Sequence, residues 1–262
     1  MPSPMKRALI AVALAACATS KPTDAPRPAA AAAAPQGPAS ARWKPIVEAE
    51  DRIAEDKKLD AGRKPAEMLE FLDLKPGMKV AELGAGGGYT SELLVRAVGE
   101  QGKVYAENPP QWAPFAGKLI DQRTQKHTNL VRVDRAPDDP LPPEAKDLDA
   151  VVIMATYHDF VGMGADRGRM NERIFAALQP GGTYTVIDSS AKAGTGAAAA
   201  DSLHRIDEAF VRSEIEKAGF KLASSSDFLR NPDDARDWSA SPRVAGEKRG
   251  TSDRFALKFV KP

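Results

Sequence analysis

The sequence predicts an α/β fold in which helices cover both faces of a mostly parallel, doubly wound sheet. Short apolar segments alternate with segments of helical periodicity between residues 78 and 224, as expected when crossover helices join the strands. Segment 148–154 is apolar apart from Asp149, which is typical of a central strand buried on both faces. A glycine-rich turn at 84–88 separates the first apolar strand from the helix behind it.

The first half of the domain is expected to contain four helices and three strands. A charged surface helix at 46–59 precedes a helix beginning at Pro65, because proline is favoured in the first helical turn. The strands are expected at 78–83, 102–106 and 129–133, and the two further helices at 89–98 and 112–125.

The second half begins with the strand at 148–154 and ends in an antiparallel pair. Helices are expected at 171–178 and 202–218, with a strand at 183–187 between them and Gly219 closing the second helix. Segment 191–200 is rich in Gly and Ala and is either a surface loop or the beginning of that helix. No clear helix separates the strand at 220–224 from the alternating segment at 254–259, which favours an antiparallel hairpin at the sheet edge.

The N-terminus has the pattern of an export signal. Lys6 and Arg7 precede an apolar stretch at 8–16 that is too short to span a bilayer. The stretch ends in Leu-Ala-Ala-Cys and resembles the bacterial lipoprotein signal, which implies a signal peptide at 1–17 and lipidation of Cys17. An ordinary signal peptide with an incidental cysteine is the alternative. The resemblance implies a lipid-anchored protein of the bacterial cell envelope, and Ala18 after the cysteine favours the outer membrane.

Composition divides the rest of the chain into a tether and one domain. Residues 18–42 are mostly Ala, Pro, Ser, Thr and Gly and are expected to be a disordered tether, which leaves 43–262 for a single α/β domain. Cys17 is the only cysteine, so no internal disulfide can form. The 37 basic and 36 acidic residues nearly balance, and no basic stripe indicates a nucleic-acid partner. The expected substrate is therefore a small molecule, or else a surface group on another molecule. The expected membrane contact is the N-terminal anchor alone, and the oligomeric state stays open.

The glycine-rich turn predicts a nucleotide-like ligand but disfavours a dinucleotide. It reads Glu-x-Gly-x-Gly-x-Gly, with Glu82 two residues before Gly84. Counted from Gly84, the third glycine of the dinucleotide fingerprint would fall at Tyr89, which argues against a nicotinamide dehydrogenase. An acidic residue suits a ligand with an ammonium group and a cationic sulfur, whereas it would repel a pyrophosphate.

This turn resembles motif I of the class I S-adenosylmethionine-dependent methyltransferases. Further similar segments lie where that family places its second strand, its fifth strand, and the helix and turn before the fifth strand. Three later segments resemble a bacterial subgroup of predicted methyltransferases. The segments are 102–107, 177–182 and 186–188 for the family, and 157–159, 203–207 and 218–220 for the subgroup. The resemblance implies a Rossmann-like, seven-stranded sheet of order 3-2-1-4-5-7-6 and S-adenosylmethionine as cofactor.

The same resemblance assigns cofactor-binding roles to six residues. Gly84, Gly86 and Gly88 would lie under the amino acid and ribose parts of the cofactor, and Glu82 would face its amino acid end. Glu107, about twenty residues past the turn, would bind the ribose hydroxyls. Asp134 would lie near adenine, or it is a turn residue paired with Arg132 or Arg135.

The segment after the fourth strand is expected to face the substrate, because ligands bind outside the carboxyl ends of strands in open α/β sheets. His158 is the candidate general base, with Asp159 to orient it and Tyr157 to stack on the substrate or contact the sulfonium. The alternative is that His158 caps the following helix. The spacing of the three histidines does not indicate a metal site, although His158, Asp159, Asp188 and His204 could converge and bind one. His204 and Arg205 are otherwise expected at the pocket mouth, or Arg205 pairs with a carboxylate.

Two functions remain open. The first is methyl transfer from S-adenosylmethionine to an unidentified small-molecule acceptor. The second is a non-catalytic envelope lipoprotein that binds S-adenosylmethionine, its demethylated product or another nucleoside. Export would separate the chain from the cytosol, where S-adenosylmethionine is made, and this keeps the second function open.

Overall fold

The computed structural model describes Met1 and residues 39–262. The expected signal peptide at 1–17, Cys17 and most of the tether lie outside the described residues. Helix α1 (Ala39–Val47) begins inside the segment expected to be tether, so residues 39–42 are helical and the boundary at 43 was placed too late. Trp43 of this helix is buried, and its indole N–H donates to Glu70 at 2.8 Å.

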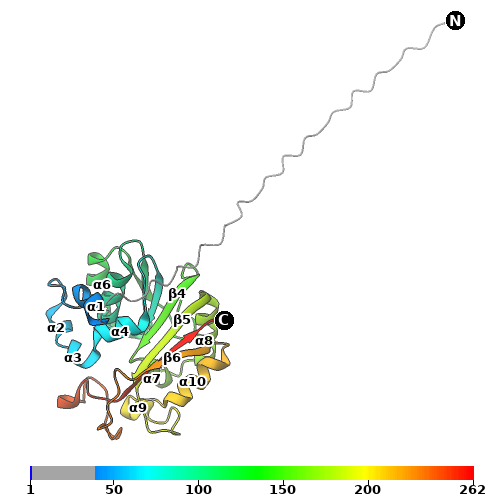
Figure 1. Ribbon diagram of the computed structural model, residues 1–262. Coiled ribbons are helices and arrows are strands. Elements are labelled where there is room, and N and C mark those ends of the chain that lie inside the picture. The colour runs from blue at the N-terminus through cyan, green and yellow to red at the C-terminus, as the bar shows by residue number, and fades with distance from the viewer. Residues whose placement is uncertain (2–38) are drawn as a thin grey trace. The chain divides into compact units, whose positions relative to one another are not determined.

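A seven-stranded sheet of order β3-β2-β1-β4-β5-β7-β6 forms the centre of the fold (Figure 1). This confirms the expected order, and β7 is antiparallel to both of its neighbours while every other pair is parallel. The strands are β1 (Lys79–Leu83), β2 (Lys103–Asn108), β3 (Leu130–Asp134), β4 (Leu148–Met154), β5 (Leu178–Ser189), β6 (Lys221–Ser226) and β7 (Arg254–Val260).

The helices pack on both faces of the sheet. Besides α1 they are α2 (Ala54–Lys57), α3 (Asp60–Arg63), α4 (Pro65–Leu72), α5 (Tyr89–Val98), α6 (Ala113–Lys126), α7 (Tyr157–Gly162), α8 (Arg167–Ala177), α9 (Ala200–Leu203) and α10 (Glu208–Lys217), with 3-10 turns η1 (Pro110–Trp112) and η2 (Gly246–Lys248). Buried side chains of α1, α4, α5 and α6 share one hydrophobic cluster, and those of α7, α8 and α10 share the other. Figure 1 shows α1, α4 and α6 on one side of β4 and α8 and α10 on the other.

Alternation along the strands explains the two clusters. Successive side chains of a strand point to opposite faces, so Ala150 and Val152 of β4 join the cluster under α5, and Val151 and Ile153 join the cluster under α8. Both sets are buried, as the apolar run predicted. Within residues 39–262, no helix is long and apolar enough to cross a membrane.

The expected surface helix at 46–59 is wrong. The chain leaves α1 at Val47 and forms only the short α2 before α3. Arg52 explains the break, because its side chain is 1 % exposed and its guanidinium pairs with Asp60 at 2.7 Å while also donating to the Val47 carbonyl. A charged residue that reads as surface-exposed in the sequence is instead turned into the fold.

The expected long helix at 202–218 is also wrong, because it divides into α9 and α10. His204 takes a left-handed conformation with φ 49°, and Ile206 then pairs with the end of β5 through Ile206 N to Ser189 O at 3.0 Å. Asp207 begins α10 by accepting a hydrogen bond from the amide of Ala209. The break turns His204 towards α7.

Candidate functional site

The candidate site lies where parallel strands end at one edge of the sheet. β1 runs into the glycine loop, β2 ends in Glu107 and Asn108, β4 leads to His158, and β5 ends near Asp188. These residues lie far apart in the sequence and come together because the carboxyl ends of parallel strands share an edge.

The three glycines of the loop have different surroundings. Gly84, Gly86 and Gly88 all have positive φ, of 67°, 56° and 82°. A Cβ on Gly84 would lie 2.6 Å from Thr156 Oγ1, and a Cβ on Gly88 would lie 2.6 Å from Arg123 Cδ. A Cβ on Gly86 would meet no protein atom within 4 Å. Packing against the protein thus requires glycine at 84 and 88, whereas Gly86 borders open space.

Side chains from other elements hold the loop in this shape. Asn108 accepts from the amide of Gly86 at 2.7 Å and donates to its carbonyl at 3.0 Å. Arg123 of α6 donates to the carbonyl of Gly87 at 2.6 Å. Sequence reasoning missed both. Asn108 had a signal, since it directly follows Glu107 at the end of a strand, but nothing in the spacing indicates Arg123.

Glu107 is a buried carboxylate with one free oxygen. Its Oε2 accepts from the amide of Gly84 at 3.1 Å, and its Oε1 has no hydrogen-bond partner among the described residues. Burial raises the pKa of Glu107 to about 8, and the charge of Asp134 adds to the rise against the Gly84 hydrogen bond. Buried polar atoms are nearly always paired, so a free carboxyl oxygen beside the loop indicates a missing donor.

The other two acidic residues point elsewhere. Glu82 is buried and accepts from the hydroxyl of Ser91 at the start of α5, with burial raising its pKa to about 7. Asp134 is exposed and accepts from Arg132 Nε at 2.8 Å, which is the ion pair given above as the alternative to adenine binding. The contacts of these two carboxylates do not direct them towards the open space beside Gly86. The cofactor-binding roles of Glu82 and Asp134 therefore stay predictions.

Replacing Glu107 by Gln is expected to remove a loss of folding stability that grows with pH. A carboxyl group whose pKa is higher in the folded than in the unfolded state stabilises the folded protein below about pH 4.5. This contribution is lost as the pH rises to about 8. Each pKa unit corresponds to ~1.4 kcal/mol, so the stability of Glu107→Gln relative to wild type should rise by on the order of 4 kcal/mol between pH 5 and pH 8.5. Urea unfolding at both pH values measures this, with exposed Glu67→Gln as the control. An equal effect of Glu107→Gln at both pH values would show that the carboxyl is not perturbed.

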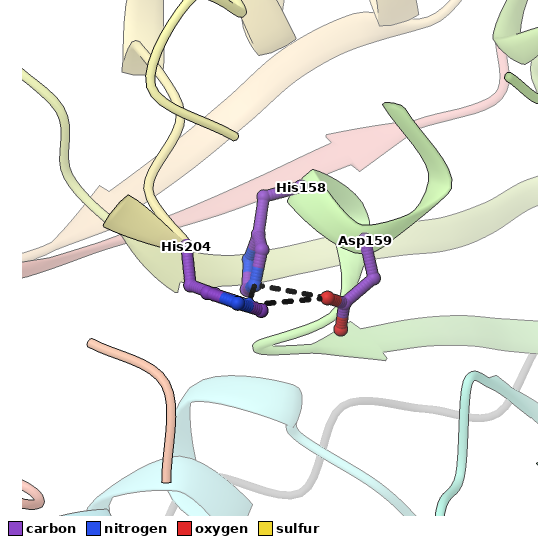
Figure 2. A group of neighbouring side chains, drawn as sticks. All are labelled: His158, Asp159 and His204. Carbon is purple, nitrogen blue, oxygen red and sulfur yellow. Dashed lines mark hydrogen bonds and ion pairs between the residues drawn. The ribbon is translucent and has the colours of Figure 1, made fainter. Parts of the chain in front are cut away.

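His158, Asp159 and His204 form a compact cluster beside this edge (Figure 2). His158 Nε2 lies 3.2 Å from His204 Nδ1 and 3.3 Å from Asp159 Oδ1, and the last two atoms are 3.4 Å apart. On its other side, His158 Nδ1 lies 2.8 Å from Asp188 Oδ1. Asp188, and not Asp159, is therefore the carboxylate that orients the His158 ring.

Two neighbouring carboxylates act on the charge state of His158. Burial alone lowers the pKa of His158, but the carboxylates of Asp188 and Asp159 outweigh burial and raise it to about 10. Nδ1 is engaged by Asp188, so Nε2 is the nitrogen that faces the rest of the cluster, and the role of His158 as general base stays a prediction. Its side chain does not cap the helix, because it bonds to Asp188 on β5.

Tyr157 does not reach the site, which corrects the expectation that it stacks on the substrate. Its ring is fully buried in the cluster under α8, whereas the His158 ring contacts Asp188 and His204. Its hydroxyl donates to Glu214 at 3.0 Å and accepts from Asn171 at 3.1 Å. Adjacent residues on a helix point in different directions, so only one of this pair can face the site.

An arginine that the sequence analysis did not single out lies beside the loop. The Arg63 guanidinium carbon is 4.3 Å from the ring centroid of Tyr89, the first residue of α5. Burial lowers its pKa, and within residues 39–262 no carboxylate lies within 4.0 Å of it. Tyr89 is in turn fixed by a 2.7 Å hydrogen bond from its hydroxyl to Asp60.

Solved structures with the same architecture identify the fold. A methyltransferase from Aquifex aeolicus, described as S-adenosylmethionine-dependent, matches 80% of this chain and 98% of its own at a TM-score of 0.56 and 19% identity. A fibrillarin from Aeropyrum pernix, solved with natively bound S-adenosylmethionine, matches 77% of this chain and 76% of its own at a TM-score of 0.51 and 14% identity. The chain has the class I methyltransferase fold. The [4+2]-cyclase SpnF also matches, over 86% of this chain and 93% of its own, at a TM-score of 0.55 and 16% identity.

Sequence relatives point to the same class. Residues 38–134 match the family model described as protein-L-isoaspartate(D-aspartate) O-methyltransferase. The relative from Pyrococcus horikoshii, named protein-L-isoaspartate O-methyltransferase, is 34% identical over 89 residues, which cover 34% of this chain and 38% of the relative. A relative of the same name from Hyperthermus butylicus is 29% identical over 142 residues, covering 51% and 54%.

The family-model match covers β1, β2, β3 and the glycine loop. The chain spans between about two fifths and half the length of these two relatives. The family-model match ends at Asp134, before β4 and the cluster of His158, Asp159 and His204. The comparisons thus support S-adenosylmethionine as the cofactor.

Proposed function

We propose that this protein binds S-adenosylmethionine at the glycine loop and transfers its methyl group to an acceptor at the same edge of the sheet. The observation that carries the proposal is the pairing of open space at Gly86 with the free Oε1 of Glu107. A ribose offers hydroxyl donors, which are the partners that Oε1 lacks. The family match over the same segment supports this assignment.

The residues present fit the two ends of the cofactor. Glu107 would accept from the ribose hydroxyls, and Arg63 would hold the carboxylate of the methionine part. Glu107 is fully shielded, so a ribose reaches it only if neighbouring side chains shift. The bound cofactor would supply a methyl group on a positively charged sulfur, which needs a nucleophile placed in line with it.

The protein's share of the reaction is then mainly positioning. Holding two reactants in the right geometry is worth roughly 7–11 kcal/mol of the barrier. An acceptor that is already nucleophilic needs this positioning and no general base. A carboxylate oxygen is such an acceptor, because its methylation requires no proton removal.

For the acceptor we place an isoaspartyl protein first and a small molecule second. The relatives named above are protein-L-isoaspartate O-methyltransferases, and an isoaspartyl residue presents a free carboxylate. The small-molecule acceptor expected from composition remains the competing proposal, because the family-model match ends before β4.

Two measurements test these proposals in sequence. Calorimetry with S-adenosylmethionine and its demethylated product should show one site for each. Transfer of a labelled methyl group is then measured with an isoaspartyl peptide, its aspartyl counterpart and a panel of small acceptors. Binding without transfer to any acceptor would favour the non-catalytic binding protein. The cyclase with this fold is an example of the same fold serving other chemistry. Absence of binding of either form would refute both functions.

We also propose that the chain is lipid-anchored in the bacterial envelope, on the pattern of Lys6, Arg7 and Leu14–Cys17. Incorporation of labelled palmitate into the expressed chain tests this, and a soluble, unlabelled product would exclude the anchor.

A further inference from the structure

We propose that His158, Asp159 and His204 bind one divalent transition-metal ion at the carboxyl edge of the sheet. Three potential ligand atoms face one another there: His158 Nε2, Asp159 Oδ1 and His204 Nδ1 (Figure 2). Two imidazole nitrogens and one carboxylate oxygen form a ligand set that suits Zn²⁺ or Fe²⁺, whereas Mg²⁺ and Ca²⁺ prefer oxygen ligands alone.

The distances between these three atoms match those expected for ligands of one metal ion. Ligands about 2.1 Å from a metal are ~3.0 Å apart at an angle of about 90° and ~3.4 Å apart at a tetrahedral angle. The three observed separations are 3.2, 3.3 and 3.4 Å. All three edges of the triangle therefore fall within the range that one ion imposes on its ligands.

The His158 ring is oriented as a metal ligand usually is. Metal-binding histidines almost always give their second ring nitrogen to a carboxylate or carbonyl, which fixes the tautomer and the ring orientation. Here His158 Nδ1 lies 2.8 Å from Asp188, leaving Nε2 for the cluster. Asp188 is fully buried and is itself held by the amides of His158 at 3.0 Å and Ser189 at 2.7 Å.

The fold also holds His204 in place at a conformational cost. Its φ of 49° is unfavourable for a residue other than glycine, by about 1–2 kcal/mol. The neighbouring residues hold this turn, since Arg205 pairs with Asp234 at 2.8 Å and Ile206 pairs with β5. A strained backbone conformation persists only where several surrounding contacts hold it, and such conformations concentrate at functional sites.

One side of the cluster is open, so an ion there would keep positions for further ligands. The side chains of His204 and Asp159 are 34% and 26% exposed, whereas that of His158 is 6% exposed. Three protein ligands and an open side are typical of catalytic rather than structural sites. If the proposed methyl transfer holds, the open position would bind an anionic oxygen of the acceptor; metal binding itself does not depend on that function.

The test uses the full chain carrying Cys17→Ser, so that the only thiol cannot bind the metal. After treatment with a chelator, the protein is titrated with Co²⁺ and followed by visible absorption and calorimetry, and then with Zn²⁺ in competition. We expect one equivalent to bind. His204→Ala and Asp159→Asn should each weaken binding at least tenfold, and Asp188→Asn should weaken it about 10–100-fold, as for a residue that orients a ligand.

His127→Ala is the matched control, because His127 is the remaining histidine and lies at the end of α6. Its affinity for Co²⁺ should equal that of the parent chain, and circular dichroism of each chelated variant checks that the fold persists. No stoichiometric binding, or the same loss in His127→Ala as in His204→Ala, would overturn the proposal. Titration of the same samples with S-adenosylmethionine separates a failure of the metal site from a failure of the cofactor site.

Discussion

Replacing Gly86 by valine is expected to weaken S-adenosylmethionine binding by at least about 100-fold while the protein remains folded. The valine side chain would enter the space where we place the ligand, since a Cβ at this position meets no protein atom within 4 Å. The positive φ of 56° adds a folding cost of about 1–2 kcal/mol, which a domain of this size should tolerate. Calorimetry gives the affinity, and thermal unfolding gives the stability.

Gly77 provides a control for this substitution. It precedes β1, at the end of that strand away from the loop, with a φ of 85°, and a Cβ there also meets nothing within 4 Å. Gly77→Val also places valine at a positive φ and should leave the affinity unchanged. Gly84→Val would instead lower stability, because its side chain would collide with Thr156. Equal affinities of Gly86→Val and Gly77→Val would place the ligand away from the loop.

Replacing Arg205 by methionine is expected to cost about 3–5 kcal/mol of stability, as when one partner of a buried ion pair is removed. The side chains of Arg205 and Asp234 are 0% and 1% exposed and lie 2.8 Å apart. Arg205 also donates to the carbonyls of Ser190 at 3.1 Å and Trp238 at 3.0 Å. These bonds tie the segment between β6 and β7 to the end of β5, and methionine leaves the Asp234 charge buried and unpaired.

Urea unfolding of two further variants tests that reason. Arg212→Met, on the surface of α10, removes only an exposed pair with Glu216 and should cost less than about 1 kcal/mol. Adding Asp234→Asn to Arg205→Met should restore part of the lost stability, because it removes the unpaired charge while the amide oxygen can still accept from a backbone N–H of Arg236 or Asp253. A double variant no more stable than Arg205→Met would show that the loss comes from the carbonyl bonds and not from the carboxylate.

Most of the sheet could be predicted because its signals are local. The apolar run at 148–154 matches β4, and the order of strands and helices follows from alternation and the resemblance. The helix starting at Pro65 also follows from local preference. The motif likewise located the glycine loop and Glu107, because β1 leads into the loop and Glu107 lies near the end of β2 at the same edge of the sheet.

The errors occur where a long-range contact outweighs a local preference. Ile206, Phe210 and Ile215 have helical spacing, but the chain breaks at His204 because Ile206 pairs with β5 and Arg205 reaches Asp234. The pattern at 157–159 suggested three side chains at one site, whereas helical geometry sends Tyr157 into the core.

The fold class, the position of the glycine loop and the acidic residue at the end of the second strand follow from the amino-acid sequence alone. These depend on periodicity and on spacing within short segments, which the chain carries locally. Three other features depend on the folded arrangement: Glu107 keeps a free oxygen, Asp188 orients His158, and His204 joins Asp159 beside it. Those relations join residues tens of positions apart, and they exist only once the strands have paired and their ends lie side by side.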